Sequence, residues 1–139
     1  MYKFDEEQLE KAVLDWLKEL GYEIAYGPEI APNGTSPERK DYHTVILEER
    51  LYNALSRINP HASEEQLQEA IRQVTTTQHP SLIMNNREFH RFITDGIDVT
   101  VHRDGEERTE KIWLIDRREP HNNDFFAVNQ FTVIEGNSN

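Results

Sequence analysis

The sequence contains no cysteine, which excludes disulfide bonds and thiolate metal ligands and agrees with a reducing, cytoplasmic location. It also lacks any apolar run near the ~20 residues that a membrane-spanning helix requires, so we expect no membrane insertion. The first residues are acidic where a secretory signal would be basic. The glycines never adopt the spacing G-x-x-x-x-G-K or G-x-G-x-x-G, and no two histidines have metal-ligand spacing. We therefore expect neither a nucleotide site nor a zinc site in this chain.

Positive charge is scarce, because 15 lysines and arginines stand against 26 aspartates and glutamates, a formal net charge of −11. The clustered cations are Arg39-Lys40, Arg87 with Arg91, and Arg117-Arg118, and each lies near acidic residues in the sequence. Such pairs are more often solvated surface than phosphate contacts. We expect this segment to bind DNA weakly by itself. The acidity favours a part of a larger assembly, or a partner for something basic.

Four segments carry the spacing of amphipathic helices. Asp5 can cap the first helix, Gln8 follows three residues later as in a capping box, and Gly21 ends it. Ser63 and Gln66 repeat the capping box at the third helix. The predicted helices span residues 5–20, 41–58, 63–74 and 81–95.

Strands are predicted in the remaining apolar stretches, at residues 22–26, 97–102, 111–116 and 125–135. Asp104-Gly105 predicts a hairpin turn, and the prolines between residues 28 and 37 predict a loop without regular structure. With 139 residues, the chain is the length of one domain, residues 1–139, with one core. The fold class we expect is α+β, with helices followed by a mainly antiparallel curved sheet.

Several polar residues are candidates for a site. Glu6, Glu7, Glu10 and Asp15 flank the apolar stripe of the first helix, and first-turn acids are favoured by the helix dipole alone, so we interpret Glu6 and Glu7 as surface charge. His90 is interpreted as a helix-surface or half-buried histidine. Asn129-Gln130 is an amide pair where a buried strand normally carries hydrocarbon, and a buried polar tie is its more common role. We interpret the aromatic residues Trp16, Trp113, Phe125, Phe126 and Phe131 as core packing.

Two motifs resemble one family, the N-terminal region of the restriction (R) subunit of type I restriction-modification enzymes. The first is the opening helix, with Leu9-Glu10, Trp16-Leu17 and Gly21-Tyr22. The second is an N-x-F-x-x-x-N-Q-F-like strand, here Asp124, Phe125, Asn129, Gln130 and Phe131. Shorter matches between the two extend the resemblance over nearly the whole chain.

The resemblance implies an incomplete restriction-endonuclease-like nuclease lobe of the P-D…(D/E)-x-K type. The family's catalytic Asp and Glu-x-Lys would follow beyond Asn139, so we expect the isolated chain to be inactive. Glu10 would be an accessory acid pointing toward the metal, although ordinary surface charge is the more common role for such a glutamate. The intact subunit would use Mg²⁺ and ATP, act on DNA, and work with methyltransferase and specificity subunits. A fragment of this kind exposes sheet edges and can self-associate.

Two other classes of protein stay open at this point. A stand-alone acidic interaction module, or a DNA mimic, would explain the charge of −11 without any catalytic residue. A small independent hydrolase is a weaker alternative, because no nucleophile with an oriented base can be assembled from these spacings.

Overall fold

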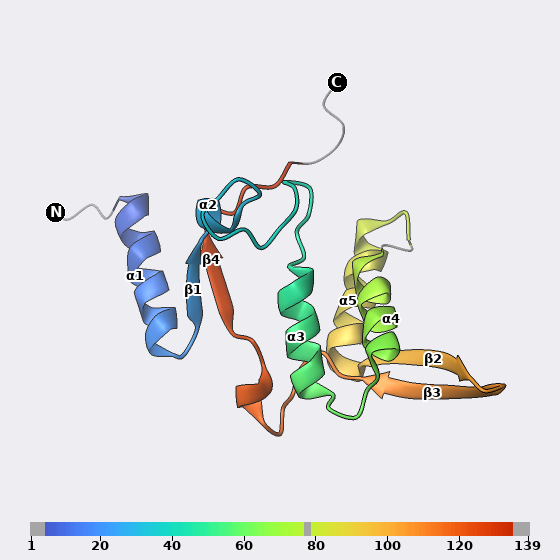
Figure 1. Cartoon of the computed structure of the whole chain (residues 1–139). Helices are drawn as coiled ribbons and strands as arrows, with labels where there is room; N and C mark the ends of the chain where they lie inside the picture. Colours follow the sequence, from blue (N-terminus) through green and yellow to red (C-terminus); the bar gives the residue numbers. More distant parts are fainter. Residues whose placement is uncertain (1–4, 77–78, 135–139) are drawn as a thin grey trace. The chain divides into compact units, whose positions relative to one another are not determined.

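The computed structural model describes residues 5–76 and 79–134, and these residues form an α+β fold, as the sequence predicts (Figure 1). The helices are α1 (Glu6–Glu19), α2 (Gly27–Ile30), α3 (Glu48–Ile58), α4 (Glu64–Thr75), α5 (Leu82–Asp95) and the 3-10 helix η1 (Pro120–Asn122). The strands are β1 (Glu23–Tyr26), β2 (Ile97–Arg103), β3 (Glu106–Ile112) and β4 (Phe126–Asn129). None of the helices in this described part is both long and apolar enough to cross a membrane.

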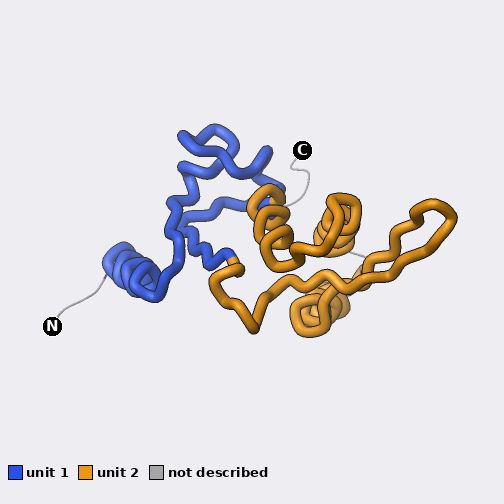
Figure 2. The backbone as a smooth tube through the Cα atoms, turned by 60° about the horizontal axis from the view of Figure 1, so that its bottom comes forward, with its two compact units in different colours: residues 1–47, 124–139 blue, residues 48–123 orange. Residues whose placement is uncertain are grey.

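The chain divides into two compact units (Figure 2). Unit 1 comprises residues 1–47 and 124–139, and unit 2 comprises residues 48–123. The four strands likewise form two separate two-stranded sheets, β1 with β4 in unit 1 and β2 with β3 in unit 2. The single sheet expected from the sequence is therefore wrong for the described residues, where β2 and β3 pair antiparallel and β1 and β4 pair in parallel.

The hydrophobic core of unit 2 lies where α3, α4 and α5 pack against the β2–β3 hairpin. Alternation along β2 explains this packing, because its buried side chains point to one face of the sheet. The hairpin turns at Asp104 and Gly105, whose φ angles of 51° and 78° suit the two-residue turn that the sequence predicts. The buried core residues are Leu55, Leu67, Ala70, Ile71, Phe92, Ile97, Val99 and Ile112.

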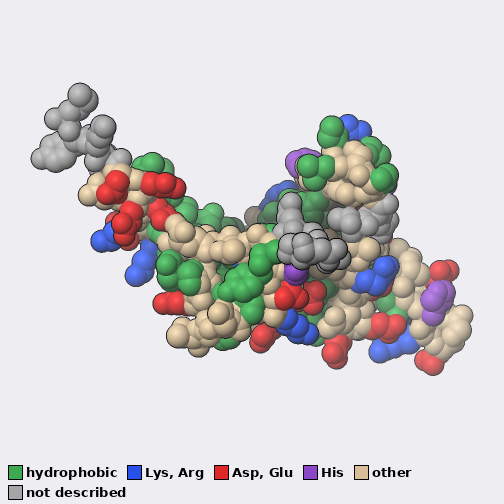
Figure 3. Space-filling view, turned by 90° about the horizontal axis from the view of Figure 1, so that it is seen from above, with side chains coloured by type: hydrophobic (Ala, Val, Ile, Leu, Met, Phe, Trp, Pro, Cys, Tyr) green, Lys and Arg blue, Asp and Glu red, His purple; other side chains and the backbone are tan. Residues whose placement is uncertain are grey.

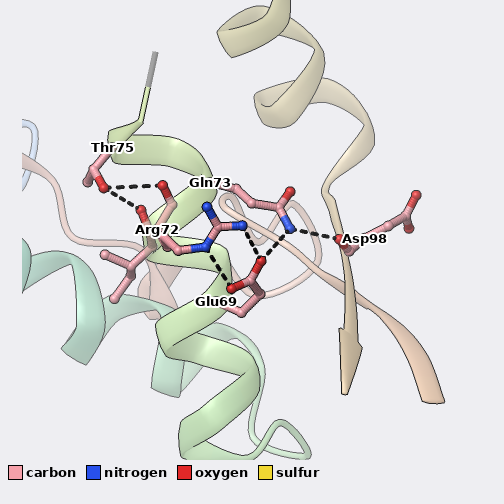
Figure 4. Close-up of polar contacts among 6 residues, drawn as sticks. Glu69, Arg72, Gln73, Thr75 and Asp98 are labelled. Atoms are coloured by element: carbon pink, nitrogen blue, oxygen red, sulfur yellow. Dashed lines mark hydrogen bonds and ion pairs between the residues drawn. The ribbon is translucent and has the colours of Figure 1, made fainter. Parts of the chain in front are cut away.

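A polar network at the surface of unit 2 ties α4 to β2 (Figure 4). The Glu69 carboxylate accepts hydrogen bonds from Arg72 Nε at 2.9 Å and Arg72 Nη2 at 2.6 Å, and the Arg72 guanidinium lowers the pKa of Glu69. Gln73 Nε2 donates to Glu69 at 3.3 Å and to the Asp98 carbonyl at 3.2 Å. Gln73 thus links this surface ion pair to the backbone of β2.

In unit 1, α1 begins and ends where its sequence predicts. The Asp5 side chain accepts the Gln8 N–H at 2.8 Å, and the Gln8 side chain accepts the Asp5 N–H at 3.4 Å, which completes the capping box. Gly21 follows the helix with a φ of 101°, in the left-handed region that favours glycine. The helix contacts both β1 and β4.

Arg39 is buried, with 5% of its surface exposed, so its interpretation as solvated surface is wrong. Its guanidinium lies 4.0 Å from the centre of the Phe131 ring. Arg39 Nη1 donates to the Thr132 carbonyl at 2.7 Å, and Nη2 donates to the Tyr42 carbonyl at 2.9 Å. Arg39 therefore joins the segment after β4 to the loop before α3.

Several elements differ from the sequence predictions. The predicted helix 41–58 begins only at Glu48, because Asp41 Oδ1 accepts the backbone N–H groups of His43 and Thr44 and so forms a turn that competes with a helix. The proline-rich loop contains the short helix α2, which has a proline in its first turn. Proline is tolerated there because the N–H groups of a first turn form no hydrogen bonds within the helix. The predicted strand 111–116 lies mostly beyond β3, which ends at Ile112.

Some predicted core aromatics are at the surface. Trp16 is 64% exposed, Trp113 41% and Phe125 42%, whereas Phe126 and Phe131 are half-buried. The predicted strand 125–135 is also shorter than expected, because β4 ends at Asn129 and the next residue, Gln130, has a φ of 51°. Residue 135 lies outside the described residues.

Candidate functional site

Glu10 of α1 meets Gln130, the first residue after β4, although the two are 120 positions apart in the sequence. Gln130 Nε2 donates to both carboxylate oxygens of Glu10, at 3.1 Å and 3.2 Å. The contact exists because β1 and β4 run parallel, with Tyr26 opposite Asn129, so both strands end at the same edge beside the helix. The structure thus brings together two of the residues that the sequence singled out.

The backbone at this edge is packed so closely that only glycine fits at position 27. A Cβ atom added to Gly27 would lie 2.1 Å from the Gln130 carbonyl oxygen and 2.5 Å from that of Asn129. Side-chain carbons essentially never approach a carbonyl oxygen so closely. Gln130 itself has a φ of 51°, a left-handed conformation that is uncommon for a residue with a side chain. Unusual backbone conformations of this kind often accompany functional sites.

A surface hollow of about 650 Å³ opens beside the Glu10–Gln130 contact. Asn129 is one of the residues that line it, and its buried Oδ1 has no hydrogen-bond partner among residues 5–76 and 79–134. A buried acceptor without a partner is uncommon in folded proteins. The residues that line the hollow are Glu6, Glu7, Glu10, Lys11, Leu14, Tyr26, Asn129 and Gln130.

The described residues do not form a complete metal site. A hard cation such as Mg²⁺ needs several oxygen ligands, with carboxylates among them. No group of three or more histidine, cysteine, aspartate or glutamate side chains within the described ranges could hold a metal ion. Glu10 and the amide oxygens of Asn129 and Gln130 are suitable donor types, but they do not suffice alone. Any metal at this edge would need further carboxylates.

The remaining candidates fall outside this contact. His90 lies exposed on α5, as expected for a helix-surface histidine. Glu6 and Glu7 lie exposed in the first turn of α1 and line the hollow. Gly27 was not recognised from the sequence, and the signal that could have found it is a glycine placed directly after a strand.

The protein is thus an α+β protein in which a carboxylate on a helix lies at the carboxyl ends of two parallel strands. In many open sheets, ligands bind at this edge. The chain belongs to the family described as the type I restriction enzyme R protein N terminus, whose model matches residues 3–139. The resemblance seen in the sequence motifs is therefore confirmed.

Two curated proteins show the relationship in detail. A putative type I restriction enzyme MjaIXP endonuclease subunit of Methanocaldococcus jannaschii is 32% identical over 125 residues, which is 90% of this chain and 12% of that protein. The type I restriction enzyme HindI endonuclease subunit of Haemophilus influenzae is 29% identical over 129 residues, which is 93% of this chain and 12% of that protein. The chain therefore matches only a small part of the length of these relatives. No solved structure matches the chain significantly.

Proposed function

We propose that this chain is the N-terminal part of the nuclease domain of a type I restriction R subunit, and that Glu10 is an accessory acid of the nuclease site. The contact between Glu10 and Gln130 carries the proposal, because it fixes a carboxylate at the edge where two parallel strands end. Family membership favours this function over a stand-alone acidic module. The intact subunit would cleave DNA with Mg²⁺ and ATP, together with methyltransferase and specificity subunits.

The chain's own residues would position the acid rather than complete the site. Gln130 holds both oxygens of the Glu10 carboxylate, and this arrangement limits the rotation of a side chain that is otherwise long and mobile. Gly27 lets β1 approach the backbone on which Gln130 stands. The remaining metal ligands and the lysine of the motif would come from residues that this sequence does not contain.

The test is DNA cleavage by the full-length subunit assembled with its partner subunits. We expect Glu10→Gln to lower the cleavage rate by about 10- to 100-fold, the range seen when groups that support a metal site are changed. ATP hydrolysis should be unchanged, which separates loss of the nuclease step from loss of assembly. Glu7→Gln is the matched control, because Glu7 lines the same hollow while the Gln130 amide donates to Glu10. Cleavage by Glu10→Gln at the wild-type rate would remove Glu10 from the site.

A second test concerns the 139-residue polypeptide by itself. We expect it to be inactive on DNA with Mg²⁺, because its described residues offer no group of acids that could hold the metal. We also expect the coding frame to continue beyond codon 139 into Pro-Asp and then Glu-x-Lys. Magnesium-dependent cleavage that survives purification and is lost on Glu10→Ala would contradict the predicted inactivity.

A further inference from the structure

Helix α1 carries two adjacent apolar stripes, of which one is half-buried and the other is exposed. The first stripe, with Leu14 and Leu17, is half-buried and lies on the same side as Glu10, whose side chain contacts Gln130. The second stripe follows the helix at positions 9, 13, 16 and 20, a spacing that places the four side chains in one line. Their exposed fractions are 58% for Leu9, 43% for Val13, 64% for Trp16 and 64% for Leu20.

This second stripe is unusual for a surface left in water. Single exposed apolar residues are common, but four large ones in a row form a continuous patch, and such patches mark interaction sites. Tryptophan is also among the residue types that contribute most to interfaces. The space-filling view shows hydrophobic side chains next to acidic ones in the part of the molecule that carries α1 (Figure 3).

The two-stranded sheet that α1 contacts is also poorly covered. β1 and β4 have four residues each, and none of these eight residues is buried. Parallel strands occur almost only in sheets that are covered on both faces, and a two-stranded sheet is marginally stable by itself. Further polypeptide that extended or covered this sheet would therefore stabilise it.

The charge on α1 argues against a second copy of the same helix as the covering element. Two copies packed stripe against stripe would bring their acidic flanks together, and like charges at an interface oppose association. α1 carries five acidic residues, Glu6, Glu7, Glu10, Asp15 and Glu19, against two lysines, Lys11 and Lys18.

We propose that the stripe Leu9-Val13-Trp16-Leu20 is a docking surface for a later segment of the same polypeptide, one that adds to the β1–β4 sheet of unit 1. This inference rests on the proposed function, since it requires the polypeptide to be longer, as its relatives are. The part matched by this chain is 12% of the length of each relative. The docking segment would present apolar side chains to the stripe and basic side chains to its acidic flanks.

Site-specific photo-crosslinking in the full-length subunit tests this proposal. A photoreactive amino acid would replace Trp16 in one variant and Val13 in a second. The second variant tests the proposal even if the substitution of Trp16 disturbs folding. Asp15 is the matched control position, because it lies on the opposite, solvent face of the same helix. Crosslinked peptides would be identified by mass spectrometry in a mixture of isotopically light and heavy subunits, which separates crosslinks within one chain from crosslinks between copies.

We expect positions 13 and 16 to crosslink within one chain to residues beyond 139, several times more than position 15 does. Crosslinks to unit 2, to a second copy or to another subunit would overturn the proposal, as would a yield no higher than that of position 15. The reaction needs neither DNA, Mg²⁺ nor ATP, so its result does not depend on Glu10. Normal DNA cleavage with crosslinks to another chain would therefore reject the docking surface alone and leave the nuclease role in place.

Discussion

The side chain of Asn59 forms two hydrogen bonds with the backbone of Trp113, 54 residues later in the sequence. Asn59 Oδ1 accepts the Trp113 N–H at 2.8 Å, and Asn59 Nδ2 donates to the Trp113 carbonyl at 2.9 Å and to the Leu55 carbonyl at 3.0 Å. Asn59 is 1% exposed. One buried amide thus joins the end of α3 to the residue that follows β3, and it satisfies backbone groups that have no strand partner.

Asn59→Ala should destabilise unit 2 strongly. The substitution removes three hydrogen bonds, each worth about 0.5–1.5 kcal/mol, and leaves the N–H and carbonyl groups of Trp113 without the Asn59 side chain. Urea denaturation of the same polypeptide with and without the change measures the free energy of unfolding. Asn53→Ala is the matched control, because Asn53 is exposed on α3, and it should change that free energy by less than about 0.7 kcal/mol. Equal effects of the two substitutions would contradict the role of Asn59.

Gly27→Ala and Gly21→Ala separate close packing from backbone conformation. At Gly21 an added Cβ meets nothing within 4 Å, and the expected penalty comes from the φ of 101° alone, roughly 1–2 kcal/mol. At Gly27 the Cβ would overlap the backbone after β4, so we expect a larger loss, about 3 kcal/mol or more. Denaturation midpoints of the two variants provide the comparison. A Gly27→Ala protein as stable as wild type would show that β1 and β4 do not approach as closely as described.

Arg39→Lys should destabilise unit 1 although it keeps the charge. A lysine cannot donate to the carbonyls of Tyr42 and Thr132 while its cation lies flat over the Phe131 ring, because it lacks the planar fork of the guanidinium. We expect a loss of about 1.5–3 kcal/mol, as for a hydrogen bond to a charged group. The exposed neighbour provides the control, since Lys40→Arg should leave the free energy of unfolding nearly unchanged. Equal stability of Arg39→Lys and wild type would contradict the burial of Arg39.

Features encoded by neighbouring residues were predictable from the sequence, whereas most contacts between distant segments were not. The capping boxes at Asp5 and Ser63 and the hairpin turn at Asp104 depend on a few adjacent residues, and each was found where predicted. The parallel pairing of β1 with β4 joins segments about a hundred residues apart, and alternation within a strand does not specify its partner. The family motif identified Glu10 and Gln130 as candidate residues. It did not predict their contact, because only the fold determines which residues of the motif lie next to each other.

Asp116 should make the stability of the loop after β3 depend on pH. The backbone N–H of Glu119, the Asn122 side chain and the backbone N–H of Arg118 all donate to its carboxylate and hold its pKa below the ordinary value. Because the pKa is lower in the folded state, the carboxylate stabilises the fold above the ordinary aspartate pKa of about 3.9. That stabilisation is lost as the pH falls through the folded-state value.

Asp116→Asn should therefore be less stable than wild type at neutral pH, and the difference should shrink as the pH falls below about 4. Chemical denaturation at a series of pH values measures this dependence. Asp95→Asn is the control, since Asp95 is exposed at the end of α5. A difference between Asp116→Asn and wild type that stayed constant from neutral to acidic pH would show that the amide loses the hydrogen bonds for steric reasons and not through the charge of the carboxylate.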